Sequence, residues 1–239
     1  IKKLQINIET IRRASVDDEK VVHCENYIGA ITIPLGVAGP INFKTNSSKS
    51  EVYIPLATTE GALVASVQRG MKAINLEGGA DVFAYKTGAT RGPVFFTGSI
   101  KKGVKLAEWL KKQKPKIKKI IESTSSHIVF KKMDIKIVGQ YLFIRFQCDT
   151  DQAMGMNMIT IGVQQAVAFI TKKTNIECLA VAGNYDIDKK PAWLNMIKSR
   201  GLEVCADVVL TEKTLRIVLK TTRTKLFNTW LSKCMIGSA

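Results

Sequence analysis

The sequence predicts an α+β protein in which a large domain of helices and strands carries an inserted smaller domain. Residues 92–181 alternate strand-like and helix-like patterns in the order β-α-β-β-α-β, which is the ferredoxin-like arrangement. The stretches on both sides of this insertion have hairpin and helix patterns of their own. With 239 residues, 46% hydrophobic and 23% charged, the chain can form one large or two modest domains with a proper core.

We expect four segments along the chain. Residues 1–26 are polar and predicted to be helical, with a capped start at Ser15. Residues 27–91 form the first part of the large domain, 92–181 the inserted small domain, and 182–239 the second part of the large domain.

A hairpin and a helix are expected before the insertion. The apolar stretch ENYIGAITIPLGVAGPINF is broken by glycines and prolines, the polar residues 45–50 form a turn, and EVYIPLA is the second strand. Residues 59–75 then follow a helical spacing, in which the small residues Ala62, Ser66 and Gly70 would allow close packing.

Within the insertion, the pattern predicts strands at 94–98, 128–137, 140–148 and 176–182, and helices at 102–124 and 153–173. The first of these helices is lysine-rich and is expected to be interrupted near Pro115. After the insertion we expect a strand at 203–210 and a helix at 211–230.

The chain is strongly basic, with a net charge of +16 and a pI near 9.7. This balance favours polyanionic partners, namely nucleic acid, an anionic membrane surface or phosphate-bearing small molecules. A genome-wide preference for lysine explains the same composition, so both interpretations stay open at this point.

Cysteine usage and hydropathy point to the cytoplasm. The five cysteines are scattered without a CxxC pair or a Cys/His cluster, which indicates reduced thiols and no zinc site. The amino terminus has no apolar core like that of a signal peptide, and no apolar run is long enough to span a bilayer. His23 and His127 have no partner at metal or catalytic-triad spacing.

A single carboxylate, Glu60, lies in the apolar stretch YIPLATTEGALVASVQRG. A carboxyl group held among Leu, Ala and Val has a raised pKa and can act as a general acid near neutral pH. The alternative is a helix-terminal role, because an acid in the first turn of a helix is favoured by the helix dipole.

The stretch DIDKKPAW places Lys189 and Lys190 between Asp188 and Pro191. A lysine on a rigid loop can stabilise the charge that develops on a carbonyl oxygen. The alternative is a solvated turn before a helix that starts at Pro191.

A third stretch, DQAMGMNM, combines an acid, an amide and two methionines around a glycine at a predicted helix start. Such a start can receive a phosphate or a flat ring, and methionines adapt to such rings. The alternative is that the methionines are core residues. Since the chain contains neither GxGxxG nor GxxxxGK[ST], a dinucleotide would bind without a Rossmann or P-loop signature.

Arg91, in GATRGPV, lies between glycines after a predicted strand. An arginine at such a place can bind a carboxylate through two parallel hydrogen bonds. A surface arginine in a turn is the alternative.

Taken together, these motifs resemble 3-hydroxy-3-methylglutaryl-coenzyme A reductase (HMG-CoA reductase) of the class found in eukaryotes and archaea. The matching motifs, in the family's order, are ENYIG, IPLGVAGP, IPLATTEGALVAS, TRGPV, AMGMNM, GNYDIDKKPA and LKTT. The resemblance implies a large domain that binds HMG-CoA and a ferredoxin-like insertion that binds NADPH, with NADH not excluded. It also implies two successive hydride transfers to the thioester, which yield mevalonate and coenzyme A.

The resemblance implies a role for each matching residue. Glu60 would donate a proton to the intermediate aldehyde, and Lys189, in a homodimer, would polarise the carbonyl from the neighbouring chain. The hydroxymethylglutaryl part would be held by Arg91, Asn184, Asp188, Lys190 and Lys233, and the coenzyme A side by Gln68, Arg69, Lys72 and Lys220. The cofactor would be bound by Ser125, Ser126, Asp151, Gln152, Met154, Gly155, Met156 and Asn157.

The chain also departs from the family pattern. It contains no GQD motif, and neither histidine matches the one that protonates the departing thiolate. We therefore expect a chain without the carboxy-terminal part of the catalytic domain, weakly active or inactive by itself. Ala182 replaces a substrate-binding serine of the family, and Gln152 replaces an aspartate. Ser126 replaces an arginine that favours the 2′-phosphate of NADPH. His127, or Lys131 and Lys132, would take over the role of this arginine.

Three functions remain open from the sequence. The first is a thioester oxidoreductase, or the amino-terminal part of one. The second is a non-catalytic relic or split subunit that binds coenzyme A or nucleotide and needs a carboxy-terminal partner. The third, nucleic-acid binding through the lysine-rich residues 101–119, is disfavoured because that segment has one aromatic residue, Trp109, and no recognised motif.

Overall fold

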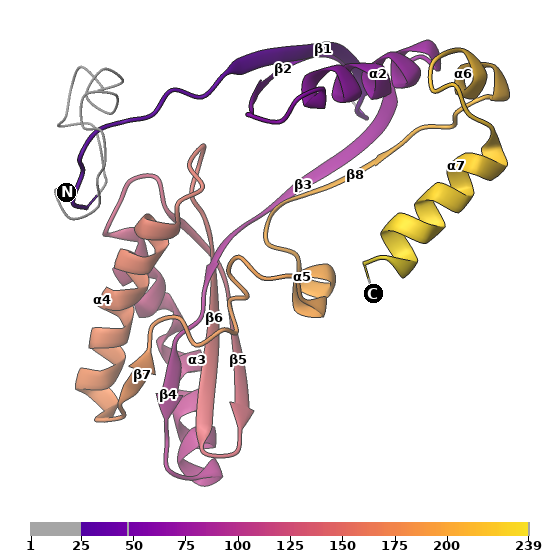
Figure 1. Ribbon diagram of the computed structural model, residues 1–239. Coiled ribbons are helices and arrows are strands. Elements are labelled where there is room, and N and C mark those ends of the chain that lie inside the picture. The colour runs from indigo at the N-terminus through magenta and orange to yellow at the C-terminus, as the bar shows by residue number, and fades with distance from the viewer. Residues whose placement is uncertain (1–24, 47, 239) are drawn as a thin grey trace, which may run out of the picture. The chain divides into compact units, whose positions relative to one another are not determined.

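The computed structural model describes residues 25–46 and 48–238 (Figure 1). The predicted helix at 1–26, apart from its last two residues, and its start at Ser15 lie outside the described residues. The chain divides into two compact units. Unit 1 contains the chain up to Val82 and from Ala206 onward, and unit 2 contains Phe83–Cys205.

Unit 1 begins with the predicted hairpin, which is confirmed. Strands β1 (Leu35–Lys44) and β2 (Lys49–Ala57) pair antiparallel. Helix α2 (Leu63–Leu76) packs on β1, and a Cβ at Gly36 would lie 2.8 Å from Val64. The expectation of close packing at Gly70 is wrong, because a Cβ there would meet nothing within 4 Å.

The predicted helix at 211–230 is divided into two. Helix α6 (Glu212–Ile217) and helix α7 (Arg223–Trp230) each begin after a threonine. Thr211 Oγ1 accepts a hydrogen bond from the Thr214 amide, and Thr222 Oγ1 accepts one from the Lys225 amide. Two capping threonines favour two helix starts, and a π-helical turn (Leu231–Ile236) follows α7.

Unit 2 is built on an antiparallel sheet. The strands are β3 (Ala80–Arg91, which starts in unit 1), β4 (Val94–Phe96), β5 (Val129–Val138), β6 (Tyr141–Asp149) and β7 (Cys178–Ala180). Four of them lie in the order β7-β4-β6-β5, and each neighbouring pair is antiparallel. The end of β3 pairs with β6, from Ala89 opposite Cys148 to Arg91 opposite Phe146.

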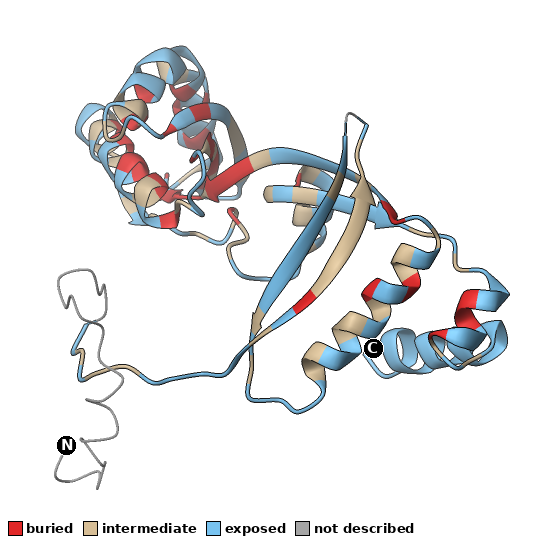
Figure 2. Ribbon diagram, turned by 90° about the horizontal axis from the view of Figure 1, so that it is seen from above, coloured by how far each residue is buried: buried red, intermediate tan, exposed pale blue. Residues whose placement is uncertain are grey.

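Helices α3 (Ile100–Glu122) and α4 (Met156–Thr174) pack on each other, and α3 also packs on β5 and β6 (Figure 1). Their apolar faces supply most of the buried core, in which Phe95, Leu110, Ile121, Phe146 and Ile159 have no exposed surface. The buried residues of the chain are concentrated in this unit (Figure 2). The element order along the chain is therefore the one that the sequence predicts for the insertion.

The two long helices of unit 2 differ from the prediction in their starts, as α2 does, which begins at Leu63 instead of residue 59. Helix α3 is continuous through Pro115 and starts after Ser99, whose Oγ accepts a hydrogen bond from the Lys102 amide at 3.2 Å. Helix α4 starts at Met156 instead of residue 153, because Gly155 has a left-handed backbone with φ 73°.

The end of unit 2 is an irregular loop followed by helix α5 (Trp193–Lys198) and strand β8 (Gly201–Asp207), which pairs with β3. The helix starts at Trp193 and not at Pro191, since Ala192 is extended with φ −161°. In the described part of the chain, no helix is long and apolar enough to cross a membrane.

Candidate functional site

The last residue of β3, Arg91, is bound on two sides within unit 2. Its Nη1 lies 3.2 Å from Asp186 Oδ2, and its Nε and Nη2 donate to Thr160 Oγ1 at 2.9 and 2.6 Å. Asp186 is 1% exposed, and its carbonyl accepts a hydrogen bond from Thr90 Oγ1. Arg91 is thus largely buried at a strand end, and the alternative of a surface turn arginine is wrong.

Asp188 is held by a second arginine. Arg200 Nη2 lies 2.6 Å from Asp188 Oδ1, and Arg91 Nη1 lies 4.0 Å from Asp188 Oδ2. Arg200 also contacts Thr90 Oγ1 through Nε and Met156 Sδ through Nη2. These contacts connect the loop that carries Asp188 to β3 and to the first turn of α4.

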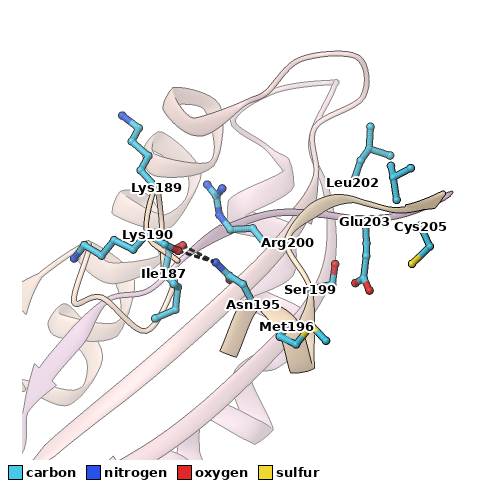
Figure 3. Close-up of a pocket in the computed structure, with 11 residues that line it drawn as sticks. Ile187, Lys189, Lys190, Asn195, Met196, Ser199, Arg200, Leu202, Glu203 and Cys205 are labelled. Atoms are coloured by element: carbon cyan, nitrogen blue, oxygen red, sulfur yellow. Dashed lines mark hydrogen bonds between the residues drawn. The ribbon is translucent and has the colours of Figure 1, made fainter. Parts of the chain in front are cut away.

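Lys189 and Lys190 are exposed, and their side chains point in different directions (Figure 3). Lys190 Nζ donates to Asn184 Oδ1 at 2.5 Å. Within residues 25–46 and 48–238, no hydrogen bond or ion pair to the Lys189 ammonium is found. A ligand oxygen can therefore approach the Lys189 ammonium without displacing a protein partner.

The backbone around these lysines is in an unusual conformation. Asn184, Ile187 and Lys189 have φ values of 67°, 48° and 57°, a region that costs β-branched and long side chains free energy. Asn195 Nδ2 donates to the carbonyls of Ile187 at 3.2 Å and Lys190 at 3.3 Å, which fixes the loop (Figure 3). Strain held in this way is common where a loop must present a functional side chain.

Two neighbouring pockets of unit 2 share residues. The first has a volume of about 500 Å³ and is lined by Ile187, Lys189, Lys190, Asn195, Met196, Ser199, Arg200, Leu202, Glu203, Val204 and Cys205 (Figure 3). The second, of about 450 Å³, is lined by Lys86, Gly88, Ala89, Thr150, Asp151, Gln152, Ala153, Met154, Arg200, Gly201 and Leu202. Arg200 and Leu202 line both, so the two pockets are adjacent.

Ionisable groups gather beside the second pocket. His127 Nδ1 lies 3.2 Å from Asp151 Oδ2, and Ser125 Oγ accepts a hydrogen bond from the His127 amide. Lys86 Nζ lies 2.5 Å from Asp149 Oδ1, and this hydrogen bond holds the pKa of Asp149 below its usual value. The turn at 124–127 and the turn at 150–155, both expected on the cofactor side, are therefore in contact.

The start of α4 follows directly on residues 150–154, which line this pocket. Gly155 precedes the helix, and no side chain caps its first turn. Met154 is 73% exposed, whereas Met156 is 6% exposed, so the alternative of core methionines applies to Met156 alone. Ser126, Gln152 and Asn157 are exposed. Uncapped amides at the start of a helix of this length can bind an anion.

In unit 1, Glu60 is exposed and lies in the bend between β2 and α2, before the first helical turn. Its amide donates to Thr58 Oγ1 at 2.9 Å. Because Glu60 is exposed, the described residues do not form the apolar surroundings that were expected for it. Leu63 and Val64 are half-buried on α2. Glu60 is likewise outside the helix, so the dipole alternative does not describe it.

The other predicted substrate-binding residues of unit 1 differ in whether their side chains are hydrogen-bonded and exposed. Gln68 Oε1 accepts from the Gly39 amide, and its Nε2 donates to the Gly39 carbonyl, so this amide group is bound to β1. The remaining four basic residues are exposed, namely Arg69, Lys72, Lys220 and Lys233.

Sequence reasoning missed four residues of the site in unit 2, which are Thr90, Thr160, Asp186 and Arg200. Asp186 stands two residues before Asp188, and this spacing in DID was the available signal. Thr90, Thr160 and Arg200 carry no motif, since the fold alone brings them together. Among the described residues, no group of three His, Cys, Asp or Glu residues could hold a metal ion.

Comparison with known proteins identifies the relatives of the chain. The family model "Hydroxymethylglutaryl-coenzyme A reductase" matches residues 1–239. The 3-hydroxy-3-methylglutaryl-coenzyme A reductase of Methanocaldococcus jannaschii is 44% identical over all of this chain and 61% of its own length. That of Methanothermobacter thermautotrophicus is 39% identical over 98% of this chain and 60% of its own. A Dictyostelium discoideum reductase is 41% identical over 90% of the chain and 41% of its own length.

Solved structures support the fold. A class II 3-hydroxy-3-methylglutaryl-CoA reductase from Streptococcus pneumoniae, bound to NADPH in open conformations, aligns with a TM-score of 0.58 at 17% identity. The alignment covers 77% of this chain and 48% of that one. The chain spans about 60% of the length of the Methanocaldococcus and Methanothermobacter relatives.

Proposed function

The chain belongs to the hydroxymethylglutaryl-coenzyme A reductase family, and from that premise we propose that it carries the binding core of an NADPH-dependent HMG-CoA reductase. The reaction consumes HMG-CoA, two NADPH and two protons, and it releases mevalonate, coenzyme A and two NADP⁺. One observation supports this proposal most directly. The pocket with Lys189 adjoins the pocket with Asp151, Gln152 and Met154, and the two share Arg200.

In this proposal, Lys189 acts on the substrate carbonyl. Its ammonium is exposed and has no partner among the described residues, so it can donate a hydrogen bond to the thioester oxygen. A cation at that point stabilises the negative charge that develops when hydride adds to the carbonyl carbon. Asp188 stays bound to Arg200 and holds the loop in place.

Lys190 and Asn184 form the proposed contact for the hydroxymethylglutaryl carboxylate. The Lys190 ammonium bound to the Asn184 side chain retains donors for a second oxygen. Arg91 is proposed for the same part of the substrate, and its guanidinium is already bound to Asp186 and Thr160. Glu60 is the proposed proton donor to the aldehyde, and Arg69, Lys72 and Lys220 the proposed contacts for coenzyme A.

The cofactor residues of unit 2 fit NADPH in their chemistry. NADPH supplies the hydride when bound. The free amides at the start of α4 can bind its pyrophosphate, and His127 and Lys131 can approach a further phosphate beside Asp149 and Asp151. The order β7-β4-β6-β5 with two helices supports the proposal that this part of unit 2, near residues 92–181, is the ferredoxin-like cofactor domain.

NADPH oxidation by the purified chain with HMG-CoA tests the proposal. Lys189→Met should lower kcat by about 10²–10³, and Glu60→Gln by about 10²–10⁴. Arg216→Met is a matched control, because Arg216 is an exposed cation of α6 outside the site. Turnover that is unchanged in Lys189→Met would contradict the proposal.

The same assay addresses the alternative of a non-catalytic subunit, which the comparisons do not favour. A folded chain that binds HMG-CoA without turnover, and gains turnover on addition of a carboxy-terminal partner, would support a split enzyme. A homodimer belongs to the same proposal, and light scattering of the purified chain would measure it.

A further inference from the structure

A buried arginine outside the proposed catalytic set lies beneath the Lys189 loop. Arg145 on β6 is 1% exposed, and it is the largest fully buried side chain in the described part of the protein. Its Nη2 donates to the Ser199 carbonyl at 2.7 Å, while its Nε has no hydrogen-bond partner among the described residues. Burying a charged group with so few hydrogen bonds costs free energy, so its presence requires an explanation.

Three consecutive residues above Arg145 are each bound to a different element of unit 2. We call Lys198, Ser199 and Arg200 the 198–200 anchor. Lys198 Nζ lies 2.8 Å from Asp134 Oδ2 on β5, and Asp134 stands directly opposite Arg145 in the β5–β6 register. The anchor is therefore fixed to β5 by its first residue and to β6 by its second.

The third residue of the anchor, Arg200, contacts the loop that carries Asp188 and Lys189. Arg200 binds Asp188 at 2.6 Å and also contacts Thr90 and Met156. Asp188 is the residue before Lys189, so each link between β6 and Lys189 is a hydrogen bond, an ion pair or a peptide bond. The sequence of links runs from Arg145 through Ser199 and Arg200 to Asp188.

The backbone of Ser199 explains why the anchor needs a fixed point. Ser199 has φ 55° and ψ 169°, a region occupied almost entirely by glycine, and it is 6% exposed. A serine is kept there only when its surroundings determine its conformation. The Ser199 amide donates to the Asn195 carbonyl at 2.8 Å, and the Arg145 guanidinium on the Ser199 carbonyl adds a second constraint from β6. The resulting turn directs Arg200 back to Asp188.

From this arrangement we propose that Arg145 is a positioning residue, which fixes the Asp188–Lys189 loop through the Ser199 carbonyl and Arg200. The role of this loop in carbonyl reduction rests on the proposed function. The ordering of the loop by Arg145 is independent of that function. In this proposal Arg145 makes no contact with substrate and acts only through Ser199 and Arg200.

Limited trypsin digestion of the full chain, analysed by mass spectrometry, tests the proposal. Trypsin cuts after Lys189, Lys198 and Arg200 only when the loop opens, and it spares Lys190 because Pro191 follows. Cleavage after Lys112, in the middle of α3, gives the reference rate for opening of the whole unit. Arg145→Met removes the charge and its hydrogen bond but keeps an unbranched side chain.

We expect Arg145→Met to raise cleavage after Lys189 about tenfold relative to cleavage after Lys112, since a hydrogen bond from a charged donor is lost. Arg145→Lys should restore part of the protection. Phe146→Leu, at the neighbouring core position, should raise both cleavages together and leave their ratio unchanged. Arg200→Met should release Lys189 but leave the site after Lys198 protected by Asp134.

A wild-type ratio in Arg145→Met, or an equal rise at Lys112, would overturn the proposal. If Arg145→Met does not fold, Arg145→Lys decides alone, and a wild-type ratio in that variant overturns it. Because digestion requires no turnover, an inactive chain with the expected cleavage pattern would count against the proposed function and not against the role of Arg145.

Discussion

Arg200 and Asp188 form an ion pair of 2.6 Å between the end of α5 and the loop that carries Lys189. Their side chains are 22% and 19% exposed, so the pair is partly shielded from solvent. The same guanidinium contacts Thr90 and Met156. The loop, the sheet and the start of α4 therefore meet at this one residue.

Arg200→Met should weaken HMG-CoA binding and lower the free energy of unfolding by about 1.5–3 kcal/mol, because the charge-assisted hydrogen bonds are lost. Isothermal titration calorimetry and urea denaturation measure the two effects. The control is Arg216→Met, whose pair with Glu212 is exposed and should contribute little. Equal losses of unfolding free energy in the two variants would show that the Arg200 contacts stabilise the protein no more than an exposed ion pair does.

Gly155→Ala should destabilise unit 2 more than Gly139→Ala does. Both glycines have positive φ, 73° and 55°, so both variants have a similar backbone cost of about 1–2 kcal/mol. A Cβ at Gly155 would overlap Thr150, whereas a Cβ at Gly139 meets nothing within 4 Å. Thermal unfolding of the two variants isolates the overlap, and equal melting temperatures would contradict the close approach of Thr150 to Gly155.

Gly155→Ala should also weaken NADPH binding, because moving Thr150 displaces the residues that line the second pocket. Fluorescence titration with NADPH measures this effect. Gly139 lies in the β5–β6 turn outside that pocket, so Gly139→Ala should bind NADPH like the unmodified chain.

Cys148 should resist alkylation in the folded protein. Burial raises the pKa of the Cys148 thiol to about 12, so its reactive thiolate is nearly absent at pH 8. Cys205 and Cys234 are exposed and should react with iodoacetamide. Peptide mass spectrometry after brief labelling tests this order, and labelling of Cys148 as fast as Cys205 would show that β6 is not protected.

The pair of Asp134 and Lys198 should make stability depend on pH at both extremes. Burial opposes ionisation of Asp134, but the hydrogen bond and charge of Lys198 lower its pKa below 3.8 overall. Its contribution is therefore present above pH 3.8 and lost as the pH falls through the lowered pKa. The hydrogen bond to Asp134 raises the pKa of Lys198 above 10.5, so that contribution is lost as the pH rises through the raised value.

Urea unfolding of Asp134→Asn beside the unmodified chain measures this dependence. The difference in free energy of unfolding should be constant near neutral pH and shrink toward acid below the ordinary carboxyl pKa. Lys132→Gln is the control, since Lys132 lies farther from Asp134, at 3.4 Å, and its side chain is 57% exposed. A difference that stays constant down to strongly acidic pH would contradict the pairing.

The alternation of strand and helix patterns predicted most of the elements, and their order along unit 2 is confirmed. Local sequence also explains where it misplaced them. Gly155 adopts a left-handed backbone that delays α4, and the threonines Thr211 and Thr222 cap two short helices where one long helix was expected. Helix α3 continues through Pro115 because buried residues on both sides of the proline, such as Leu110 and Ile121, pack in the core.

Sequence by itself determined the family and the motif residues, because these depend on residue types at fixed spacing. The cofactor role of the two stretches beside Asp151 was an expectation from the resemblance, and their contact is seen only in the structure. Only the tertiary structure decided that Arg200 links both pockets and that Arg145 lies buried beneath Ser199. It also decided that Glu60 is exposed within this chain. Residues far apart in sequence, such as Arg145 and Ser199, meet through strand register and a strained turn, and no local pattern encodes those contacts.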